Sequence, residues 1–497
     1  MVNYTHDERR GKMSDIQGLY RLIYRFYRTQ IESGLYQRGE PLPAALEISE
    51  IFNISFSTAR KALQTLKNDG YITLSPGRTA TVRWNDACGR NRNELYDRAA
   101  AIRDMYGAMS YFLPPVLAQG ARCLEAGALK SLAPVISEIE NDNCGAVFEF
   151  TAFFIKQLGD PVLLHLVCEL SNFVHAAFSG DDAGAHVNNR ERHWAEYMPP
   201  QLFHDIAAAV EAGDTARAED LFYELAGSYC RSMNDYLDAA ARGRATGRIS
   251  FDWRVYAEQE RHLYSAAVDL LYRIDTRKYP GRWLPPVPEL AASLGLSEIT
   301  VRRTIKLLNA IGVTETQNRR GTRVFGTEAA RRAVKIDAGV FRGQFLFGLQ
   351  LLHILALTIE NVSYEAFPFF TEEGLQRVTD AVEDDLRGGR EFLTISEALA
   401  LICRASDSAA IKEIYSKIAD RLIWLYPLRL IELHGIELKD FAKLAAMTAE
   451  SLRAGRRRDF SRALSQLVDN AFLAAQAALL QLEIKEAAAL RLPRDGC

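Results

Sequence analysis

Two short segments of this chain carry residue types that bind nucleic acid, at matching positions. Arg60 and Lys61 in the first segment correspond to Arg302 and Arg303 in the second, at a constant offset of 242 residues. The planar guanidinium of arginine matches the O6 and N7 acceptors of guanine, and lysine binds phosphate as a point charge. Basic residues on one helix are often only a solvated face. Their repetition in two similar modules favours a DNA interface.

The first segment belongs to a predicted module of three helices followed by a β-hairpin, which is the order of a winged helix-turn-helix. Apolar residues spaced by three or four positions define the helices. Ser55 or Ser57 caps the third helix, and Gly70 follows its end. The predicted elements are helices over Asp15–Ser33, from Pro43 to about Phe52 and from the cap to Asp69, and strands over Tyr71–Leu74 and Ala80–Trp84.

The second segment belongs to a copy of this module. Eight residue types recur at the same offset, from Gly39 to Gly70 and again from Gly281 to Gly312. The repeat is a duplicated domain, because solenoid repeats have periods of about 20–50 residues. The predicted elements are helices from about Tyr256 to Asp275, from Pro285 to Leu294 and from Ser297 to Ala310, and strands over Val313–Thr316 and Thr322–Phe325.

One face of each third helix is expected to pack on its module while the other enters the major groove. Arginine and Gln64 suit base edges, whereas lysine, serine and threonine more often bind phosphate. Arginines of the wings, Arg83 among them, would reach the backbone or the minor groove. The predicted DNA-binding residues are Ser57, Thr58, Arg60, Lys61, Gln64 and Arg78 in the first module, and Thr300, Arg302, Arg303, Lys306, Arg319, Arg320 and Arg323 in the second.

Each module is followed by a long stretch with helical periodicity and no strand signal. Ala212-Gly213 and Ala454-Gly455 share the offset of 242, and each precedes a long last helix. The duplicated unit is therefore a module with its helical domain. Arg242–Arg248 is a linker by composition. The predicted domains are a winged helix over 14–85, a helical domain over 92–241, a linker over 242–252, a second winged helix over 253–326 and a second helical domain over 328–492.

The charge of the chain is unevenly distributed. The 497 residues have a net charge of −3, which alone argues against nucleic acid. Residues 14–85, however, contain 9 Lys and Arg against 6 Asp and Glu, and residues 251–326 contain 12 against 8. Local charge is the footprint of nucleic-acid binding. Seven cysteines without paired spacing, and no apolar run longer than Phe345–Leu357, predict a cytoplasmic protein without a membrane span.

The motifs Gly39–Pro43, Ser55–Leu63 and Leu66–Ile72 resemble the GntR family of bacterial transcription factors, and Gly281–Gly312 is similar to a second copy. The resemblance implies a winged helix that binds a palindromic operator, usually as a homodimer, joined to an effector domain that binds a small molecule. The helical parts are similar to the all-helical FCD effector class. We therefore expect a mainly α protein with two winged helices, each followed by a helical effector-like domain.

The chain departs from the family at positions that usually hold arginine, and it keeps the wing glycine only in the second module. We therefore expect the second module to be the more family-like reader. A glutamate in place of arginine could accept a hydrogen bond from a cytosine amino group, or it could repel phosphate. The departures are Leu46 and Pro288 in the second helices, Phe56 and Glu298 after the capping serines, and Thr79 against Gly321 in the wings.

Neither a metal site nor a catalytic constellation is predicted. Many FCD domains bind a metal through one aspartate and three histidines, but the positions implied here hold other residues, such as Val147 and Thr151. No phosphate-binding or nucleophile motif is present, so we expect no enzyme and no cofactor. The aromatic runs Phe148–Phe154 and Phe367–Phe370 could line an effector pocket or form core. The histidines concerned are His165, His175, His186, His193 and His204.

These features predict a DNA-binding regulator that reads an imperfect palindrome, because its two recognition helices differ. The chain could present both readers itself, as an intramolecular pseudo-dimer, or form a homodimer. The helical domains would sense an unidentified small molecule or mediate dimerisation. A different class stays open, an interaction or adaptor protein that uses one or both winged helices to contact proteins. A steep dependence of DNA affinity on salt would distinguish the two.

Overall fold

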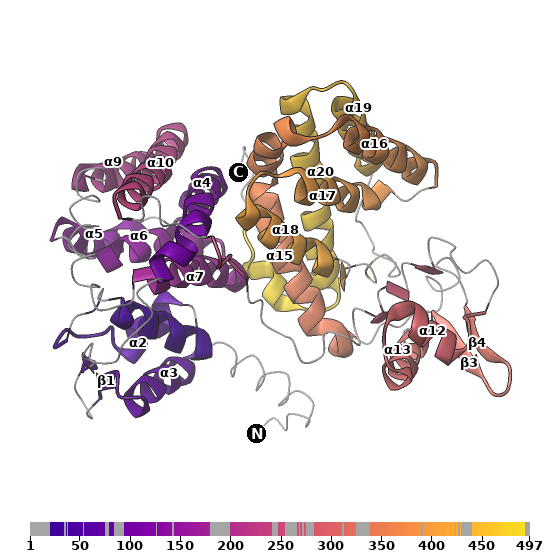
Figure 1. Ribbon diagram of the computed structural model, residues 1–497, viewed down its shortest axis with the longest axis horizontal. Helices are drawn as coiled ribbons and strands as arrows, with labels where there is room; N and C mark the ends of the chain where they lie inside the picture. The colour runs from indigo at the N-terminus through magenta and orange to yellow at the C-terminus, as the bar shows by residue number, and fades with distance from the viewer. Residues whose placement is uncertain are drawn as a thin grey trace.

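The computed structural model places two helical halves side by side, with a winged helix at each outer end (Figure 1). It describes residues 20–33, 36, 38–52, 54–74, 79–83, 94–125, 127–141, 144–178, 199–240, 247–253, 266–267, 269–270, 273–274, 283–310, 313–324, 338–388, 391–422, 424–425, 428 and 440–492. The mainly α class with two winged helices is confirmed.

The first winged helix, here called the first reader, comprises the described residues from 20 to 83. Residues 20–32 are helical and are followed by α2 (Ala45–Ile51) and α3 (Phe56–Asn68). Strands β1 (Ile72–Thr73) and β2 (Thr81–Val82) pair in antiparallel fashion. Apolar side chains of all three helices and both strands form one core. The predicted turn after β1, including Arg78, lies outside the described residues.

The second reader comprises α12 (Val287–Leu294), α13 (Glu298–Ala310), β3 (Thr314–Gln317) and β4 (Gly321–Val324). Of its predicted first helix, only residues 266–267, 269–270 and 273–274 are described, and they are helical. The offset of 242 holds in three dimensions, because the bridge between Pro41 and Thr81 recurs between Trp283 and Arg323.

The two helical halves contain corresponding helices in the same order. Gly213 and Gly455 both adopt a left-handed φ, of 70° and 67°, before the last helix of each half. The first half contains α4 (Glu94–Arg122), α5 (Leu132–Glu140), α6 (Cys144–Gln157), α7 (Pro161–His175), α9 (Pro200–Glu211) and α10 (Thr215–Ala240). The second contains α15 (Ala338–Ala366), α16 (Glu372–Arg387), α17 (Thr394–Ala405), α18 (Ala409–Leu422), α19 (Phe441–Arg453) and α20 (Arg457–Gln481), and then the short η6 (Lys485–Ala489).

Two helices are long and apolar enough to cross a membrane by length and composition alone. They are the helical stretches Arg342–Phe369 and Arg457–Gln481. Within the most apolar part of the first, 78% of the residues are buried inside the protein, as expected of a core helix. For the second the share is 39%, and its N-terminal turn carries Arg457, Arg458 and Asp459.

The predicted linker is not a free tether over its whole length. Residues 241–246 lie outside the described residues, but residues 247–253 pack on both halves. Trp253 is fully buried and its backbone N–H donates to Glu413 on α18 (3.0 Å), while Phe251 makes an edge contact with Phe173 on α7. The part of the predicted linker over residues 247–252 thus packs on the helical halves, and Phe251 belongs to the core.

Candidate nucleic-acid interface

The N-terminus of α3 is fixed by a serine cap. The Ser55 side chain accepts a hydrogen bond from the backbone N–H of Thr58, and its hydroxyl also pairs with the hydroxyls of Thr58 (2.8 Å) and Ser57 (2.9 Å). Thr58 is only 2% exposed, so its expected outward position is wrong. Its hydroxyl completes the cap, which leaves no surface for phosphate.

Four of the predicted first-reader residues lie on the exposed face of α3, together with Phe56. Arg60 has no ion-pair partner within the part of the chain that the structure describes. The ammonium of Lys61 lies 3.9 Å from the ring centroid of Tyr20, and the Gln64 amide donates to Asn68 (2.9 Å). Arg60 is thus the most available cation of this face. The four residues are Ser57, Arg60, Lys61 and Gln64.

The second recognition helix, α13, has the same cap and a different charge pattern. The hydroxyls of Ser297 and Thr300 lie 2.9 Å apart, and Thr300 is half-buried. Glu298 Oε2 accepts from the Arg302 guanidinium (3.3 Å), one helical turn later. Arg303 and Lys306 are exposed. Arg302 is therefore partly neutralised by its own helix, unlike Arg60.

The second wing is formed by β3, β4 and a tight turn. Arg319 (φ 65°) and Gly321 (φ 101°) adopt left-handed conformations there, and glycine adopts such a conformation without steric cost. Arg319 and Arg320 are exposed at the tip, and Arg323 is half-buried on β4. The wing glycine that the sequence predicted at residue 321 thus has the conformation that requires it.

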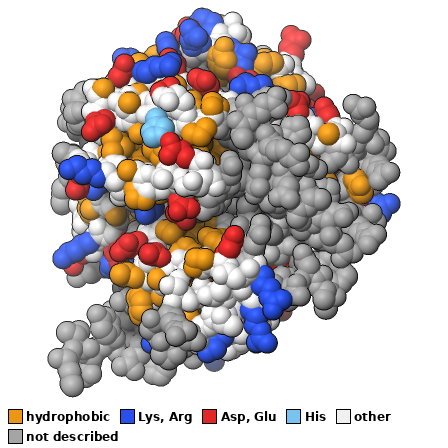
Figure 2. Space-filling model, turned by 90° about the vertical axis from the view of Figure 1, so that its left-hand side faces the viewer, with side chains coloured by type: hydrophobic (Ala, Val, Ile, Leu, Met, Phe, Trp, Pro, Cys, Tyr) orange, Lys and Arg blue, Asp and Glu red, His pale blue; other side chains and the backbone are white. Residues whose placement is uncertain are grey.

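The first reader presents its cations at one end of the molecule. Figure 2 shows a group of Lys and Arg side chains at the lower end of this face, where the first reader lies, while the upper part of the face carries Lys and Arg mixed with Asp and Glu. The exposed cations of this reader include Arg38, Arg60, Lys61, Lys67 and Arg83. These exposed cations would attract a polyanion to the first reader.

The first reader is docked onto its helical half through a buried ion pair and an aromatic contact. Arg25 donates to Glu169 on α7 (2.5 Å), and the rings of Phe26 and Phe148 are 4.7 Å apart. His165 lies next to Glu169, at 3.6 Å. Burial lowers the pKa of His165, which favours a neutral imidazole beside the Arg25–Glu169 pair. Reader and helical half therefore share a polar anchor.

A second group of charges lies where α2 faces α6. Burial raises the pKa of Glu149, and the nearby carboxylates of Glu138 and Glu47 raise it further. Burial lowers the pKa of Lys156, against the opposing effect of Glu50. Both shifts favour the neutral forms of the two groups on α6.

The two halves contact each other in a reciprocal manner. The first helices, α4 and α15, pack on each other, and each also packs on the other half's α7 equivalent: α4 on α18, and α15 on α7. Two-fold symmetry requires such reciprocal contacts. If an element of one half contacts a second element of the other half, the symmetry also places the equivalent pair in contact. The halves are thus related as the subunits of a symmetric dimer are.

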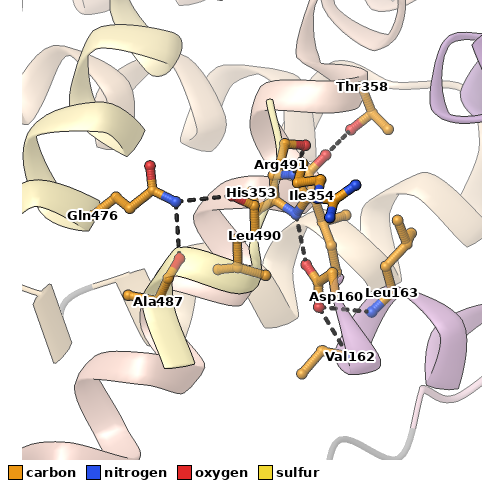
Figure 3. A network of polar contacts seen from close by, with 10 residues as sticks. All are labelled: Asp160, Val162, Leu163, His353, Ile354, Thr358, Gln476, Ala487, Leu490 and Arg491. Atoms are coloured by element: carbon orange, nitrogen blue, oxygen red, sulfur yellow. Dashed lines mark hydrogen bonds and ion pairs between the residues drawn. The ribbon is translucent and has the colours of Figure 1, made fainter. Parts of the chain in front are cut away.

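A buried histidine joins the halves at the start of α7 (Figure 3). His353 Nδ1 lies 3.0 Å from Oδ2 of Asp160, and His353 Nε2 lies 3.0 Å from the carbonyl oxygen of Arg491. Both side chains are fully buried. Oδ1 of Asp160 accepts from the backbone N–H groups of Val162 and Leu163.

The symmetric counterpart of this contact also exists. Tyr111 on α4 stands 242 residues before His353, and its hydroxyl hydrogen-bonds the side chain of Ser408. Ser408 caps α18 as Asp160 caps α7, by accepting from the N–H of Ile411 (3.2 Å). The first helix of each half therefore bonds the cap of the other half. No motif in the sequence around His353 predicts this link.

The segment after α20 completes the contact. The N–H of Arg491 donates to the carbonyl of Leu158 (3.0 Å), and the Gln476 amide holds the carbonyls of Ala487 and Leu490. Gly159 has φ 69°, and a Cβ there would lie 1.9 Å from the carbonyl oxygen of Ala489. Only glycine permits this approach.

Among the described residues, no group of three or more His, Cys, Asp or Glu side chains could hold a metal ion. His165 and His175 are buried, and His204 contacts Glu140 at the surface (2.9 Å). His186 and His193 lie outside the described residues.

The aromatic runs contribute to the core. Phe150 and Phe154 are fully buried and make edge contacts with Phe203 and Phe222, on α9 and α10. Phe367 and Phe370 pack against Phe460.

Comparisons with known proteins identify the two readers. The sequence model of the gntR family of bacterial regulatory proteins matches residues 19–82 and 266–324. A search of curated proteins finds no match. Among solved structures, GntR from Streptococcus agalactiae aligns at 16% identity over 42% of this chain and 99% of its own, with a TM-score of 0.20.

A second solved structure is that of Lar, described as controlling the expression of the Listeria monocytogenes agr system and mediating virulence. It aligns at 16% identity over 47% of this chain and 99% of its own, with a TM-score of 0.21. Such low TM-scores leave the assignment to the two sequence matches, which coincide with the two observed winged helices. The chain therefore carries, in tandem, two winged helices that each match the sequence model of the gntR family of bacterial regulatory proteins.

Proposed function

We propose that the chain is a transcriptional regulator that binds one operator with both readers, as an intramolecular pseudo-dimer. The reciprocal packing of α4 on α18 and α15 on α7 carries this proposal. Ordinary dimeric regulators use a two-fold axis to place two recognition helices on successive half-sites. Here the two halves of one chain supply that axis, in the cytoplasm, where the chromosome lies.

The placement of the recognition helices supports this reading. In Figure 1, α3 and α13 lie at opposite ends of the molecule and on the same lower side. Their outward residues differ, with Arg60 unpaired among the described residues and Arg302 tied to Glu298. Two unequal helices on one side of a pseudo-symmetric body fit an imperfect palindrome.

The helical halves have a structural role in this proposal. They hold the readers apart through the contacts of α4 with α15 and α18. The Arg25–Glu169 anchor couples the first reader to α7, whose N-terminus carries the Asp160–His353 link. A small molecule that shifts α7 would therefore move the first reader.

The test is selection of duplexes from genomic DNA by the full-length protein, followed by affinity measurements at several salt concentrations. We expect one enriched site with two unequal half-sites. Arg60→Ala and Arg302→Ala should each weaken binding by about 1–3 kcal/mol and relax the base preference at one position of the corresponding half-site. Met447→Ala, a change at an exposed residue of α19, is the matched control.

A perfectly symmetric site bound by two chains would contradict the pseudo-dimer. Absence of enrichment even at low salt would contradict DNA binding and favour the adaptor alternative, in which the winged helices contact proteins.

A further inference from the structure

The first residues of the two recognition helices are exposed and chemically opposite. Phe56 begins α3 directly after its cap, Ser55, and is 53% exposed. Glu298, 242 residues later, begins α13 directly after Ser297 and is also exposed. The N-terminal residues of a recognition helix are those that contact base edges in the major groove. Both residues therefore stand where a base would be read.

The surroundings of Phe56 leave few competing readers at this end of α3. The hydroxyls of Ser57 and Thr58 are engaged by Ser55 (2.9 and 2.8 Å). Lys61 lies over the ring of Tyr20. The phenyl ring is therefore the free group at the helix start. The apolar feature of the major groove is the 5-methyl group of thymine.

Glu298 offers the opposite chemistry at the equivalent position. Its Oε2 accepts from Arg302 (3.3 Å), and its carboxylate has a second oxygen with further acceptor capacity. The Arg302 cation also offsets the repulsion between a carboxylate and the DNA backbone. The major-groove group that donates to a carboxylate is the N4 amino group of cytosine.

We propose that Phe56 and Glu298 are the residues that make the two half-sites unequal: the first reader selects thymine through its 5-methyl group, and the second selects cytosine through its amino group. The inference rests on the proposed DNA binding. It assigns the difference between the half-sites to one position of the recognition helix.

The test begins with selection from a random duplex pool by the full-length wild type and by Phe56→Ala. The half-site whose consensus changes in the variant is that of the first reader. Because Phe56 is exposed, its removal leaves the core of the reader intact, and circular dichroism verifies the fold. Phe56→Leu, which keeps an apolar side chain, is a second variant.

The decisive measurement compares the selected duplex with one in which deoxyuridine replaces thymine at the assigned position. This exchange removes the methyl group and keeps every hydrogen-bonding group. Wild type should bind the deoxyuridine duplex about 4-fold more weakly, the loss expected for one unburied methyl group. Phe56→Ala should bind both duplexes equally, whereas Phe56→Leu and the control Met447→Ala should keep the difference.

The role of Glu298 in the second reader is tested by substitution and by exchanging the two residues between the readers. Glu298→Gln should lose the cytosine preference at the equivalent position. The double variant Phe56→Glu with Glu298→Phe should exchange the preferences of the two half-sites.

The outcomes separate this inference from the proposed function. If no duplex is enriched at low salt, the DNA-binding proposal fails. If a site is enriched but holds no thymine at the first reader's position, or binds equally with deoxyuridine, DNA binding stands and the role of Phe56 is refuted. A cytosine preference that survives Glu298→Phe in the double variant, which removes every side-chain acceptor, refutes the role of Glu298.

Discussion

At the scale of residues, the halves depend on a few buried polar groups placed between apolar helices. His353 is enclosed by Asp160, the carbonyl of Arg491 and the ring of Phe472, which stacks on it at 5.0 Å. Removal of one partner from such a buried contact leaves the other polar group buried without a hydrogen bond, which is costly. The contact between Asp160 and His353 therefore specifies how α15 packs on the start of α7.

We predict that His353→Ala destabilises the helical body by about 3–5 kcal/mol, because Asp160 then stays buried without its partner. The midpoint of urea unfolding, followed by far-UV circular dichroism of the full chain, measures this. Arg342→Ala is the control: it removes the exposed Arg342–Glu486 pair of the same helix, which should cost about 0–1 kcal/mol. Equal shifts for the two variants would contradict the role of His353.

At the scale of elements, a short segment after α20 binds the other half. Residues 485–492 contact the turn between α6 and α7, where Gly159 leaves no room for a side chain. Residues 247–253 follow α10 and likewise reach the second half through Trp253 and Glu413. Each half therefore sends its trailing segment across the interface.

We predict that Gly159→Ala releases residues 485–492, whereas Gly213→Ala does not. Both glycines have nearly the same left-handed φ, 69° and 70°, so the backbone strain of alanine is matched. Only at Gly159 would the new Cβ meet another segment, at the carbonyl of Ala489. Faster amide hydrogen exchange at Arg491 in Gly159→Ala alone is the expected result. The same acceleration in both variants would indicate strain only.

Elements with strong local signals could be predicted from the sequence, and contacts between distant elements could not. The long last helix predicted after Ala212-Gly213 is observed as α10, because its apolar periodicity is long and uninterrupted. Helix α5, with Pro134 inside a short apolar run, has a weak signal and was missed. Exposure of the recognition-helix residues followed from periodicity, except at Thr58, where the cap hydrogen bond turns the side chain inward.

The link between Asp160 and His353 had no signal in either segment. Asp160 reads as an ordinary helix cap before a proline, and His353 as one polar interruption of an apolar helix. Their separation of 193 residues makes the contact a property of the packed halves.

At the scale of the whole molecule, the interface resembles that of a dimer whose subunits have been joined. The reciprocal contacts of α4, α7, α15 and α18 bury apolar surface on both halves. The covalent connection through residues 241–246 raises the effective concentration of each half near the other, so that their association is intramolecular. This gain requires no additional contact between the halves.

We predict that cleavage at a protease site introduced between residues 242 and 246 leaves the two fragments associated, because packing holds them. Size-exclusion chromatography of the cleaved protein should give one peak with the elution volume of the uncut chain. Fragments that separate at micromolar concentration would show that the connection, and not the interface, keeps the halves together.

The segment that follows α20 has a consequence for synthesis. A ribosome adding about 5–20 residues per second makes Asp160 roughly 10–40 s before His353, and Arg491 later still. Both DNA-binding domains are complete before residues 485–492 exist. A chain terminated before residue 485 would thus contain both readers but would lack the contact of residues 485–492 with the turn between α6 and α7. The synthesis of residues 485–492 is therefore needed before the contact with the turn at Gly159 can hold the two halves in the observed arrangement.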